Sequence, residues 1–340
     1  MNFSIDIVTP IELDCIRCDW ETLEKGKDMT YFQTFSWYKM LSRFVSDCLL
    51  TKTEVLVVRD DNNVAKIIAP LWIVKHSIWR NIRKGIYIWG IGGWSDYLNL
   101  IYLDFDSHAF NALNDCIETR YHLNDFYLNL IPQETELYSY LYCYKDSEVS
   151  SVENCVELLL PESIDDYCKK LSKNARQNIR TAYNRIAKDE ISFVYIFDDH
   201  AADKSKCVSL REIRVKQKNR IASIKHMIKV KLLSLFEYEF PKYLPIVDDC
   251  NSHIMSVYES DKIVAFFNYG IDAIHNRIVV MAAGIDNSYA RYSPGVLLLE
   301  KFIREQYKNE SRYNIDFTRG EEPYKYTLGG VKHVSYSFVY

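Results

Sequence analysis

Several patterns that would assign a chain to a membrane, a secretory route or a disulfide scaffold are missing from this sequence. No uncharged apolar run approaches the length of a membrane span. Residues 1–6 carry neither the basic start nor the long apolar core of a secretory signal. The nine cysteines are odd in number and scattered, which suits a reducing compartment better than a disulfide framework. We therefore expect a cytoplasmic protein with no membrane span.

Catalytic and ligand motifs with a fixed spacing are also scarce. The sequence contains no Gly-x-Ser-x-Gly elbow and no Walker loop, and no histidine has a partner at a telling spacing. Cys15 and Cys18 form a Cys-x-x-Cys pair without a second pair nearby, so idle or buried thiols are expected there. Covalent serine catalysis and nucleotide hydrolysis therefore find no support, and we expect no metal.

The composition is that of an ordinary globular protein. The chain has 340 residues, of which 48% are hydrophobic and 26% charged, so it is long enough for two domains of usual size. A net charge of −4 gives no general attraction to nucleic acid or to acidic lipid. We expect no DNA partner, and any site for a polyanion has to be local.

The chain is organised around the stretch from Tyr292 to Gly330. A β-branched and apolar run at 277–283 precedes a polar loop, and Ser293, Pro294 and Gly295 then open an amphipathic helix. We expect the Ser293 hydroxyl to cap this helix, with proline in the first turn. A glycine in that turn would let an anion approach the exposed amides, where the helix dipole favours negative charge. The order of strand, loop, helix and strand thus outlines a phosphate site, although most such caps only start helices.

A second polar block follows the helix. Asp316 is expected at the end of a short strand, and charged and tyrosine side chains crowd the loop that follows it. Six polar or ionisable groups beside an apolar strand are more than a plain turn needs. Residues 292–295 together with 316–325 closely resemble the signature of the cellulose-biosynthesis-associated acetyltransferase-like group of the GNAT superfamily, which is related to the FemAB-type transferases.

The order of the expected elements repeats along the chain. A hairpin at 53–74 and another at 253–271 are each followed by a third strand, a capped helix and a further strand. Together with the resemblance, this repeat predicts a mixed α+β protein with two tandem GNAT-like domains, each a mostly antiparallel sheet flanked by helices. The expected domains are 1–155 and 156–340, with a basic helical insert at about 201–240.

The resemblance implies an acyl donor and its binding site. In this superfamily, helix-start amides hold the pyrophosphate of coenzyme A in a V-shaped gap between two strands. On this sequence those amides would belong to Gly295, Val296 and Leu297, with Ser293 as the cap. The full Arg/Gln-x-x-Gly-x-Gly/Ala motif is missing, and only its first glycine is kept. Acetyl-CoA or another acyl-CoA is the expected donor, and aminoacyl-tRNA, the FemAB donor, stays open.

Acyl transfer to an amine needs a deprotonated nucleophile, a polarised carbonyl and a proton for the departing thiolate. Asp316 is our candidate for the carboxylate that accepts or orients the amine protons, although an ion pair with Arg319 or Lys325 is an equal alternative. Tyr324 is the candidate proton donor, with Tyr326 as its substitute. Arg319 and Lys325 look like anchors for an acidic or phosphorylated acceptor.

Three further segments resemble the family. Residues 163–186 are expected to form one basic helix that Ser163 caps, with an apolar stripe and an opposite cationic ridge of Lys169, Lys173, Arg176 and Arg180. A solvated face explains most such ridges, but similarity to the FemAB segment at 171–180 makes Arg176 or Arg180 a candidate contact for an anionic donor or acceptor. Trp37 and Asp96 lie in segments that the family also carries, where they either line the ligand cleft or serve packing and turn formation.

Three functions follow as hypotheses. The first is a cytoplasmic N-acyltransferase acting on an amino-sugar, expected in nucleotide-linked form, in surface polysaccharide synthesis. The second is a FemAB-like transferase that uses charged tRNA, which the basic helices motivate. The third is a non-catalytic binding module on the same fold.

Overall fold

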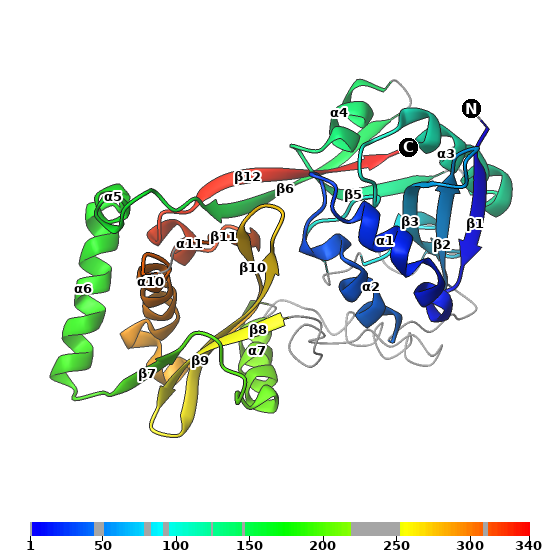
Figure 1. Cartoon of the computed structure of the whole chain (residues 1–340). Coiled ribbons are helices and arrows are strands. Elements are labelled where there is room, and N and C mark those ends of the chain that lie inside the picture. Colours follow the sequence, from blue (N-terminus) through cyan, green and yellow to red (C-terminus); the bar gives the residue numbers. More distant parts are fainter. Residues whose placement is uncertain are drawn as a thin grey trace. The chain divides into compact units, whose positions relative to one another are not determined.

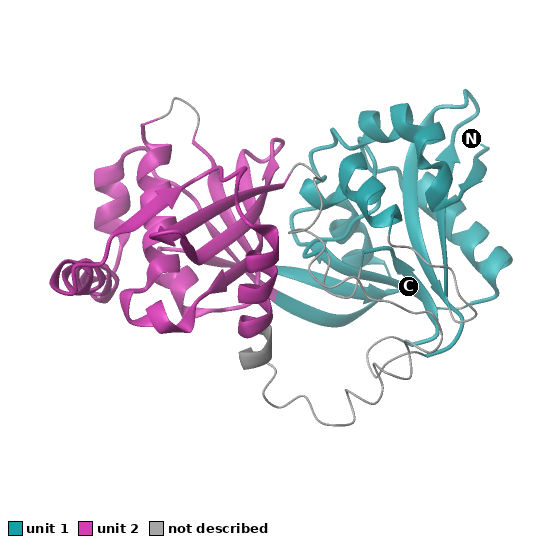
Figure 2. Ribbon diagram, turned by 90° about the horizontal axis from the view of Figure 1, so that it is seen from below, with its two compact units in different colours: residues 1–153, 226–241, 334–340 teal, residues 154–225, 242–333 magenta. Residues whose placement is uncertain are grey.

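The computed structural model describes residues 2–43, 51–77, 83–90, 95–123, 125–144, 147–218, 252–308 and 312–340. These residues form two compact units (Figure 2). Unit 1 contains residues 2–153 and 334–340, and unit 2 contains residues 154–218 and 252–333 of the described chain. The proposal that 1–155 and 156–340 are separate folding domains stays a prediction.

Figure 1 labels most of the helices and strands of both units. The strands of the first half are β1 (Ser4–Val8), β2 (Thr51–Arg59), β3 (Ala65–Val74), β4 (Gly85–Ile88), β5 (Phe126–Pro132) and β6 (Glu148–Leu158). Its helices are η1 (Pro10–Ile16), α1 (Arg17–Leu23), η2 (Tyr31–Gln33), α2 (Phe35–Ser42), α3 (Ser107–Tyr121) and α4 (Glu136–Cys143).

The second half of the chain also consists of strands and short to medium-length helices. Its strands are β7 (Phe193–Ile196), β8 (Ser252–Glu259), β9 (Lys262–Asp272), β10 (Arg277–Ile285), β11 (Asn314–Arg319) and β12 (Val331–Val339). Its helices are α5 (Ile164–Lys170), α6 (Lys173–Lys188), α7 (Lys204–Lys218), η3 (Asn287–Tyr292), α10 (Pro294–Gln306) and α11 (Pro323–Thr327).

The two units repeat one topology. In unit 1 the strand order is β1-β2-β3-β4-β5-β12, and in unit 2 it is β6-β11-β10-β9-β8-β7. Neighbouring strands run antiparallel except for β4 with β5 and β10 with β11, which are parallel pairs joined through α3 and α10 respectively. The predicted α+β class, with mostly antiparallel sheets and a tandem arrangement, is confirmed.

One feature of this topology has no local signal in the sequence. The strand that flanks β5 in unit 1 is β12, which comes from the C-terminal end of the chain. The strand that flanks β11 in unit 2 is β6, which follows directly after the helices of unit 1. Each parallel pair is therefore completed by a strand from the other half of the sequence.

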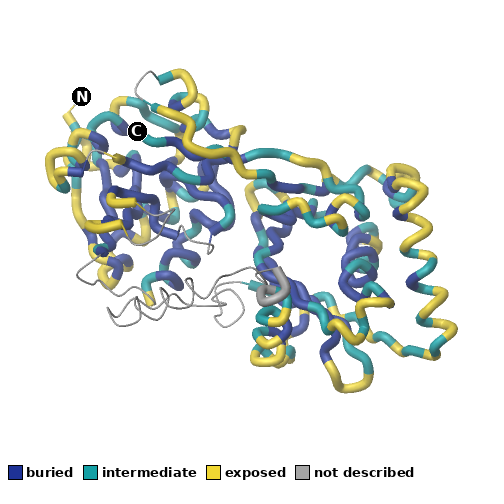
Figure 3. Tube along the Cα trace, turned by 180° about the vertical axis from the view of Figure 1, so that it is seen from behind, coloured by how far each residue is buried: buried dark blue, intermediate teal, exposed yellow. Residues whose placement is uncertain are grey.

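The core of unit 2 explains the position of α10. Burial is greatest along the sheet strands (Figure 3). On α10, buried Leu298, Leu299, Phe302 and Ile303 recur at the spacing of one helical face, and the helix packs on β8 and β9. This packing fixes the helix with its first turn next to the end of β10, because only the short η3 lies between them.

Two expected elements differ in the structure. The single helix predicted at 163–186 is two helices, since the chain breaks at Leu171 and the Ser172 hydroxyl accepts a hydrogen bond from the Ala175 amide at 3.0 Å to start α6. The Ser163 cap is confirmed, with its hydroxyl accepting from the Asp166 amide at 3.1 Å. The strand predicted at 99–103 is only an isolated bridge to β3. Of the predicted insert at 201–240, α7 is described and residues 219–240 lie outside the described residues.

Candidate active site

The parallel strands β10 and β11 separate soon after they begin. They pair at three positions, of which the last joins Val279 to Asp316. Beyond this point a register shift between Val280 and Ala282 interrupts the pairing of β10 with β9, and a second shift between Asp316 and Arg319 interrupts the pairing of β11 with β6. Bulges of this kind turn strands apart and leave backbone groups outside the ladder. The two strands thus diverge after Val279 and Asp316.

Thr318 lies at this divergence in an unusual conformation. Its φ angle is 55°, in the left-handed region that a β-branched residue rarely adopts. The Thr318 hydroxyl donates to the Val280 carbonyl oxygen at 3.2 Å, and its amide donates to Oδ1 of Asp316 at 2.7 Å. These two bonds hold a strained backbone in place, and such strain clusters at ligand sites and active sites.

Asp316 belongs to a buried ionic network. It lies in the middle of β11 rather than at its end, and its side chain is fully buried. Oδ2 of Asp316 lies 3.2 Å from Nη1 of Arg277, whose Nε lies 3.0 Å from Oδ2 of Asp272. Asp316 is therefore paired with Arg277, a partner that was not predicted from the sequence.

Glu157 and His275 extend this network. Nη1 of Arg277 is 3.6 Å from Oε1 of Glu157, and Nδ1 of His275 is 2.9 Å from Oδ2 of Asp272. Burial would raise the pKa of Asp272, but the hydrogen bond to His275 and the charges of His275 and Arg277 outweigh it and lower that pKa. Burial prevails at Glu157, where it raises the pKa despite the nearby charge of Arg277.

The start of α10 differs from a serine-capped helix. Ser293 has φ 51° and ψ 47°, a left-handed conformation, and its side chain makes no capping hydrogen bond. The predicted cap by its hydroxyl is therefore wrong, because the left-handed backbone ends η3 at the same residue and turns the side chain away from the first-turn amides. Pro294 does occupy the first helical turn, as predicted.

The amides of the first turn of α10 differ in their availability. The Leu297 amide donates to the Ser293 carbonyl oxygen at 3.1 Å, which is the first hydrogen bond of the helix, so its expected role for an anion is wrong. Among the described residues, no acceptor is found for the amides of Gly295 and Val296. A Cβ atom on Gly295 would lie 3.0 Å from Cδ1 of Ile285. The glycine is thus explained by close packing on β10 instead of by access for an anion.

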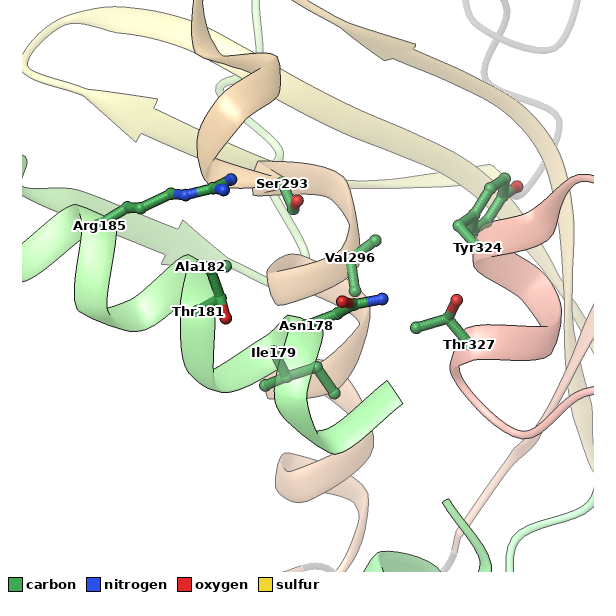
Figure 4. Close-up of a pocket in the computed structure, with 9 residues that line it drawn as sticks. All are labelled: Asn178, Ile179, Thr181, Ala182, Arg185, Ser293, Val296, Tyr324 and Thr327. Atoms are coloured by element: carbon green, nitrogen blue, oxygen red, sulfur yellow. The ribbon is translucent and has the colours of Figure 1, made fainter. Parts of the chain in front are cut away.

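A cavity of about 270 Å³ opens beside this turn (Figure 4). Ser293 and Val296 line it from the start of α10, and Tyr324 and Thr327 line it from α11. The other wall is the face of α6 that carries Asn178, Ile179, Thr181, Ala182 and Arg185. Three of the predicted site residues, namely Ser293, Val296 and Tyr324, therefore meet around one cavity in unit 2.

Tyr324 is half-buried on α11, between β11 and α7. The guanidinium carbon of Arg214 on α7 lies 5.7 Å from the centroid of its ring, and Nη2 of Arg214 lies 3.5 Å from Oε1 of Glu322. Burial raises the pKa of the Tyr324 phenol, and the charge of Arg214 offsets this only in part. The phenol is thus protonated at neutral pH, as a proton donor must be.

The structure places Lys325, Arg319 and Tyr326 away from the lining of the cavity. The Lys325 ammonium is buried and donates to the carbonyl oxygens of Arg319 and Gly320, each at 2.8 Å. It therefore closes the loop after β11, and an acceptor would have to displace these bonds to reach it. Arg319 ends β11, and exposed Tyr326 donates to Glu321 at 3.2 Å.

The remaining predicted residues also lie outside the cavity lining. Nη1 of Arg176 donates to the Leu171 carbonyl oxygen at 2.8 Å, so this side chain caps the C-terminal end of α5. In unit 1, Trp37 is fully buried, and its indole N–H donates to Oγ of Ser95 at 2.9 Å. Asp96 is partly exposed in the loop after Ser95. Trp37 therefore has the surroundings of a packing residue, which is one of its two predicted roles.

Reasoning from sequence missed the whole α6 wall and the central arginine of the ionic network. Asn178 and Arg185 are seven residues apart and hence on one face of α6, but nothing in the sequence says that this face meets α10. Arg277 begins a strand after a polar turn, where an exposed cation is the usual expectation. No described group of three His, Cys, Asp or Glu residues could hold a metal ion. No helix in the described ranges is long and apolar enough to span a membrane.

Comparisons with known proteins bear on the domain and on the fold. Residues 173–326 match the family model described as the acetyltransferase (GNAT) domain, and this range contains every residue that lines the cavity except Thr327. A search of curated proteins found no match.

Three solved structures are similar over nearly the full length. One is FemX, with a TM-score of 0.60 at 10% identity, covering 99% of this chain and 97% of that chain. A conserved protein of unknown function from Bacteroides thetaiotaomicron VPI-5482 has a TM-score of 0.53 at 14% identity, covering 99% of both chains. A tandem GNAT protein from the clavulanic acid biosynthesis pathway has a TM-score of 0.50 at 10% identity, covering 99% of this chain and 98% of that chain. At such low identity these likenesses establish the GNAT-type fold of the chain and leave its reaction to be argued from the site.

Proposed function

We propose that this protein is an N-acyltransferase that moves an acetyl group from acetyl-CoA to the amine of an amino-sugar in surface polysaccharide biosynthesis. The observation that carries the proposal is the cavity at the start of α10, which Val296 and Tyr324 line and where the Val296 amide has no acceptor among the described residues. The match of residues 173–326 to the GNAT domain model supports acyl transfer as the reaction class.

The residues around the cavity fit a phosphate-bearing acyl donor. The Gly295 and Val296 amides at the positive end of α10 would hold the diphosphate, since helix N-termini favour anions and these amides have no acceptor among the described residues. Val296 and Ile179 add apolar lining for a flexible arm, and Ser293 adds a hydroxyl. The diverging strands β10 and β11 leave backbone groups of β10 outside the ladder, where they can bind the acyl carbonyl.

The reaction requires one bond to form and one to break. The deprotonated amine nitrogen attacks the thioester carbon, and the carbon–sulfur bond then breaks. Tyr324 donates its phenolic proton to the leaving thiolate, and the amine releases its extra proton to water. Asp316, which is buried against Arg277, acts as a positioning residue because it holds the amide of Thr318 at the point where the strands diverge.

The proposed acceptor is an amino-sugar in nucleotide-linked form. The resemblance of residues 292–295 and 316–325 to the polysaccharide-associated acetyltransferase group suggests an amino-sugar, and a nucleotide-linked sugar would suit a cytoplasmic enzyme. Arg319 at the end of β11 is the proposed contact for its phosphate groups. The proposal includes a cytoplasmic location and two domains, 1–155 and 156–340.

The test is binding followed by turnover. Isothermal titration with acetyl-CoA should show saturable binding to one site per chain. Incubation with acetyl-CoA and a panel of free and nucleotide-linked amino-sugars should give an acetylated product by mass spectrometry, which heat-denatured protein should not give. The absence of both binding and product would overturn the proposal.

A second candidate is transfer of an amino acid from aminoacyl-tRNA. It is favoured by the exposed cations Lys169 on α5 and Lys173, Arg176 and Arg180 on α6, and by the fold shared with FemX. It predicts tRNA binding whose affinity falls steeply as salt is raised, because phosphate contacts release counterions. Acetyl-CoA turnover without salt-sensitive tRNA binding would decide for the first candidate.

A further inference from the structure

The wall of the cavity that belongs to α6 carries an unusual pair of polar side chains. Asn178 and Arg185 both line the cavity and are separated by seven residues, or two helical turns, which corresponds to about 10 Å along the axis. Figure 4 shows Arg185 extending toward Ser293 at one end and Asn178 reaching between Val296 and Thr327 at the other. Between them, Thr181, Ile179 and Ala182 complete the wall.

Arg185 is the one cationic residue among the nine that line the cavity. Its Nη1 donates to the Arg291 carbonyl oxygen at 2.8 Å, and no acceptor is found among the described residues for its other N–H groups. The neighbouring cation Arg291 is already paired, with Nη2 at 2.9 Å from Asp189. Arg185 therefore presents an anchored guanidinium with unused donors to the same end of the cavity as the start of α10.

Asn178 offers a neutral donor and acceptor at the opposite end. No hydrogen-bond partner of its side-chain amide is found in the described part of the chain, and Figure 4 shows that amide pointing toward Thr327, which also lines the cavity. The Thr327 hydroxyl donates to the Pro323 carbonyl oxygen at 3.0 Å, so its oxygen remains able to accept. This end of the cavity thus suits a ligand amide, which both donates and accepts.

We propose that α6 recognises an acyl-phosphopantetheine arm. Arg185 binds the phosphate of the arm, and Asn178 binds its distal amide. This inference rests on the proposed acyl transfer. In an extended phosphopantetheine arm the distal amide lies about nine bonds, or about 10 Å, from the phosphorus. That length matches the separation of Arg185 and Asn178 along α6. Coenzyme A and the prosthetic arm of an acyl carrier protein share this chemistry.

The inference goes beyond the start of α10. Two backbone amides bind any phosphate with little regard for what is attached to it. An arginine and an asparagine that lie about 10 Å apart along one helix favour a ligand of matching length and polarity, so the α6 wall supplies selectivity for the donor.

The experiment uses four probes and three variants of the full chain. The probes are acetyl-CoA, acetyl-4′-phosphopantetheine, acetyl-pantetheine, which has no phosphate, and ADP, which has no arm. The variants are Arg185→Gln, Asn178→Ala and Lys188→Gln, where Lys188 is an exposed α6 cation outside the cavity lining. Dissociation constants come from isothermal titration, and thermal melting checks that each variant is folded.

A crossed pattern is expected. Arg185→Gln should weaken acetyl-CoA, acetyl-phosphopantetheine and ADP by about tenfold to a hundredfold and leave acetyl-pantetheine unchanged. Asn178→Ala should weaken the three pantetheine probes by about threefold to tenfold and leave ADP unchanged. Lys188→Gln should match the wild type throughout. If the wild type binds acetyl-CoA more tightly than acetyl-phosphopantetheine, the donor is free coenzyme A. If it binds both equally, the donor is the arm of an acyl carrier protein.

Two results separate the possible failures. If the wild type binds acetyl-CoA but folded Arg185→Gln and Asn178→Ala bind all probes as the wild type does, or lose all probes equally, the role of α6 is overturned and the proposed function stands. If the folded wild type binds none of the probes, the proposed function falls and this inference falls with it.

Discussion

Nη1 of Arg277 lies 3.2 Å from Oδ2 of Asp316, and both side chains are buried. A buried carboxylate next to a buried guanidinium is costly to desolvate and depends strongly on its partner. Arg277 also contacts Asp272 and Glu157, so one guanidinium contacts three carboxyl groups of the unit 2 sheet. This network holds β11 where it diverges from β10, and the first prediction concerns its removal.

Arg277→Met should destabilise the protein by about 3–5 kcal/mol, because Asp316 and Asp272 would keep buried charges without this partner. The measurement is urea unfolding near neutral pH. Lys169→Met is the matched control, since its ion pair with Asp166 is exposed and should contribute less than about 1 kcal/mol. The double variant Arg277→Met with Asp316→Asn should recover part of the loss, and a double variant as unstable as the sum of the two single variants would argue against a coupled pair.

The second prediction concerns the acid stability of Asp272. Its pKa is lowered in the folded protein, so its ionised form adds stability above the ordinary aspartate pKa, and that stability is lost as the pH falls through the lowered folded value. Asp272→Asn should therefore be less stable than the wild type at pH 6, and the difference should shrink toward pH 3. Urea unfolding at a series of pH values measures this. A stability difference that does not change with pH would show that Asp272 contributes only by packing.

The third prediction tests the strained backbone of Thr318. Because its φ is 55°, Thr318→Gly should be more stable than Thr318→Ala by about 1 kcal/mol, although both lose the hydroxyl bond to Val280. Thr181 inside α6 is the control, where alanine should be more stable than glycine by about 1 kcal/mol. The same order of stability at both positions would mean that Thr318 is not strained.

The fourth prediction concerns proton donation by Tyr324. Tyr324→Phe should lower kcat by about a hundredfold or more and leave the Kd of acetyl-CoA nearly unchanged, since a general acid acts on the leaving group. The raised pKa of the phenol also predicts no alkaline fall in wild-type kcat up to about pH 9. Tyr326→Phe is the control, because its exposed phenol contacts Glu321 outside the cavity lining and should not affect kcat. Unchanged turnover in Tyr324→Phe would remove Tyr324 from the mechanism.

Much of the fold could be predicted because its signals are local. The hairpins at 53–74 and 253–271 follow from β-branched runs around polar turns, and α10 follows from its apolar face and Pro294. The pairing of β12 with β5 and of β6 with β11 could not be predicted, since hydrogen bonds between distant strands leave no spacing in the sequence. The break at Leu171 was missed because the apolar period continues across it.

The site was predicted less completely than the fold. The sequence predicted that the helix start at 293–297 and the loop after β11 form one site. Ser293, Val296 and Tyr324 from these two segments do line one cavity. The composition of the second segment also assigned Lys325 to a ligand, whereas the turn of α11 directs its ammonium to backbone carbonyl oxygens. The left-handed Ser293 was not predicted, since Ser-Pro at a helix start usually places serine in the capping conformation.

The most direct test is to follow the NMR signal of the Gly295 amide while the donor binds. The chain has 11 glycines, so ¹⁵N-glycine labelling gives a short list of signals, and Gly295→Ala identifies the one from the start of α10. We predict that acetyl-CoA shifts the Gly295 signal in a saturable way, that ADP shifts it as well, and that acetyl-pantetheine shifts it far less. A Gly295 signal that stays in place while acetyl-CoA binds would contradict the central claim that α10 holds the phosphate of the donor.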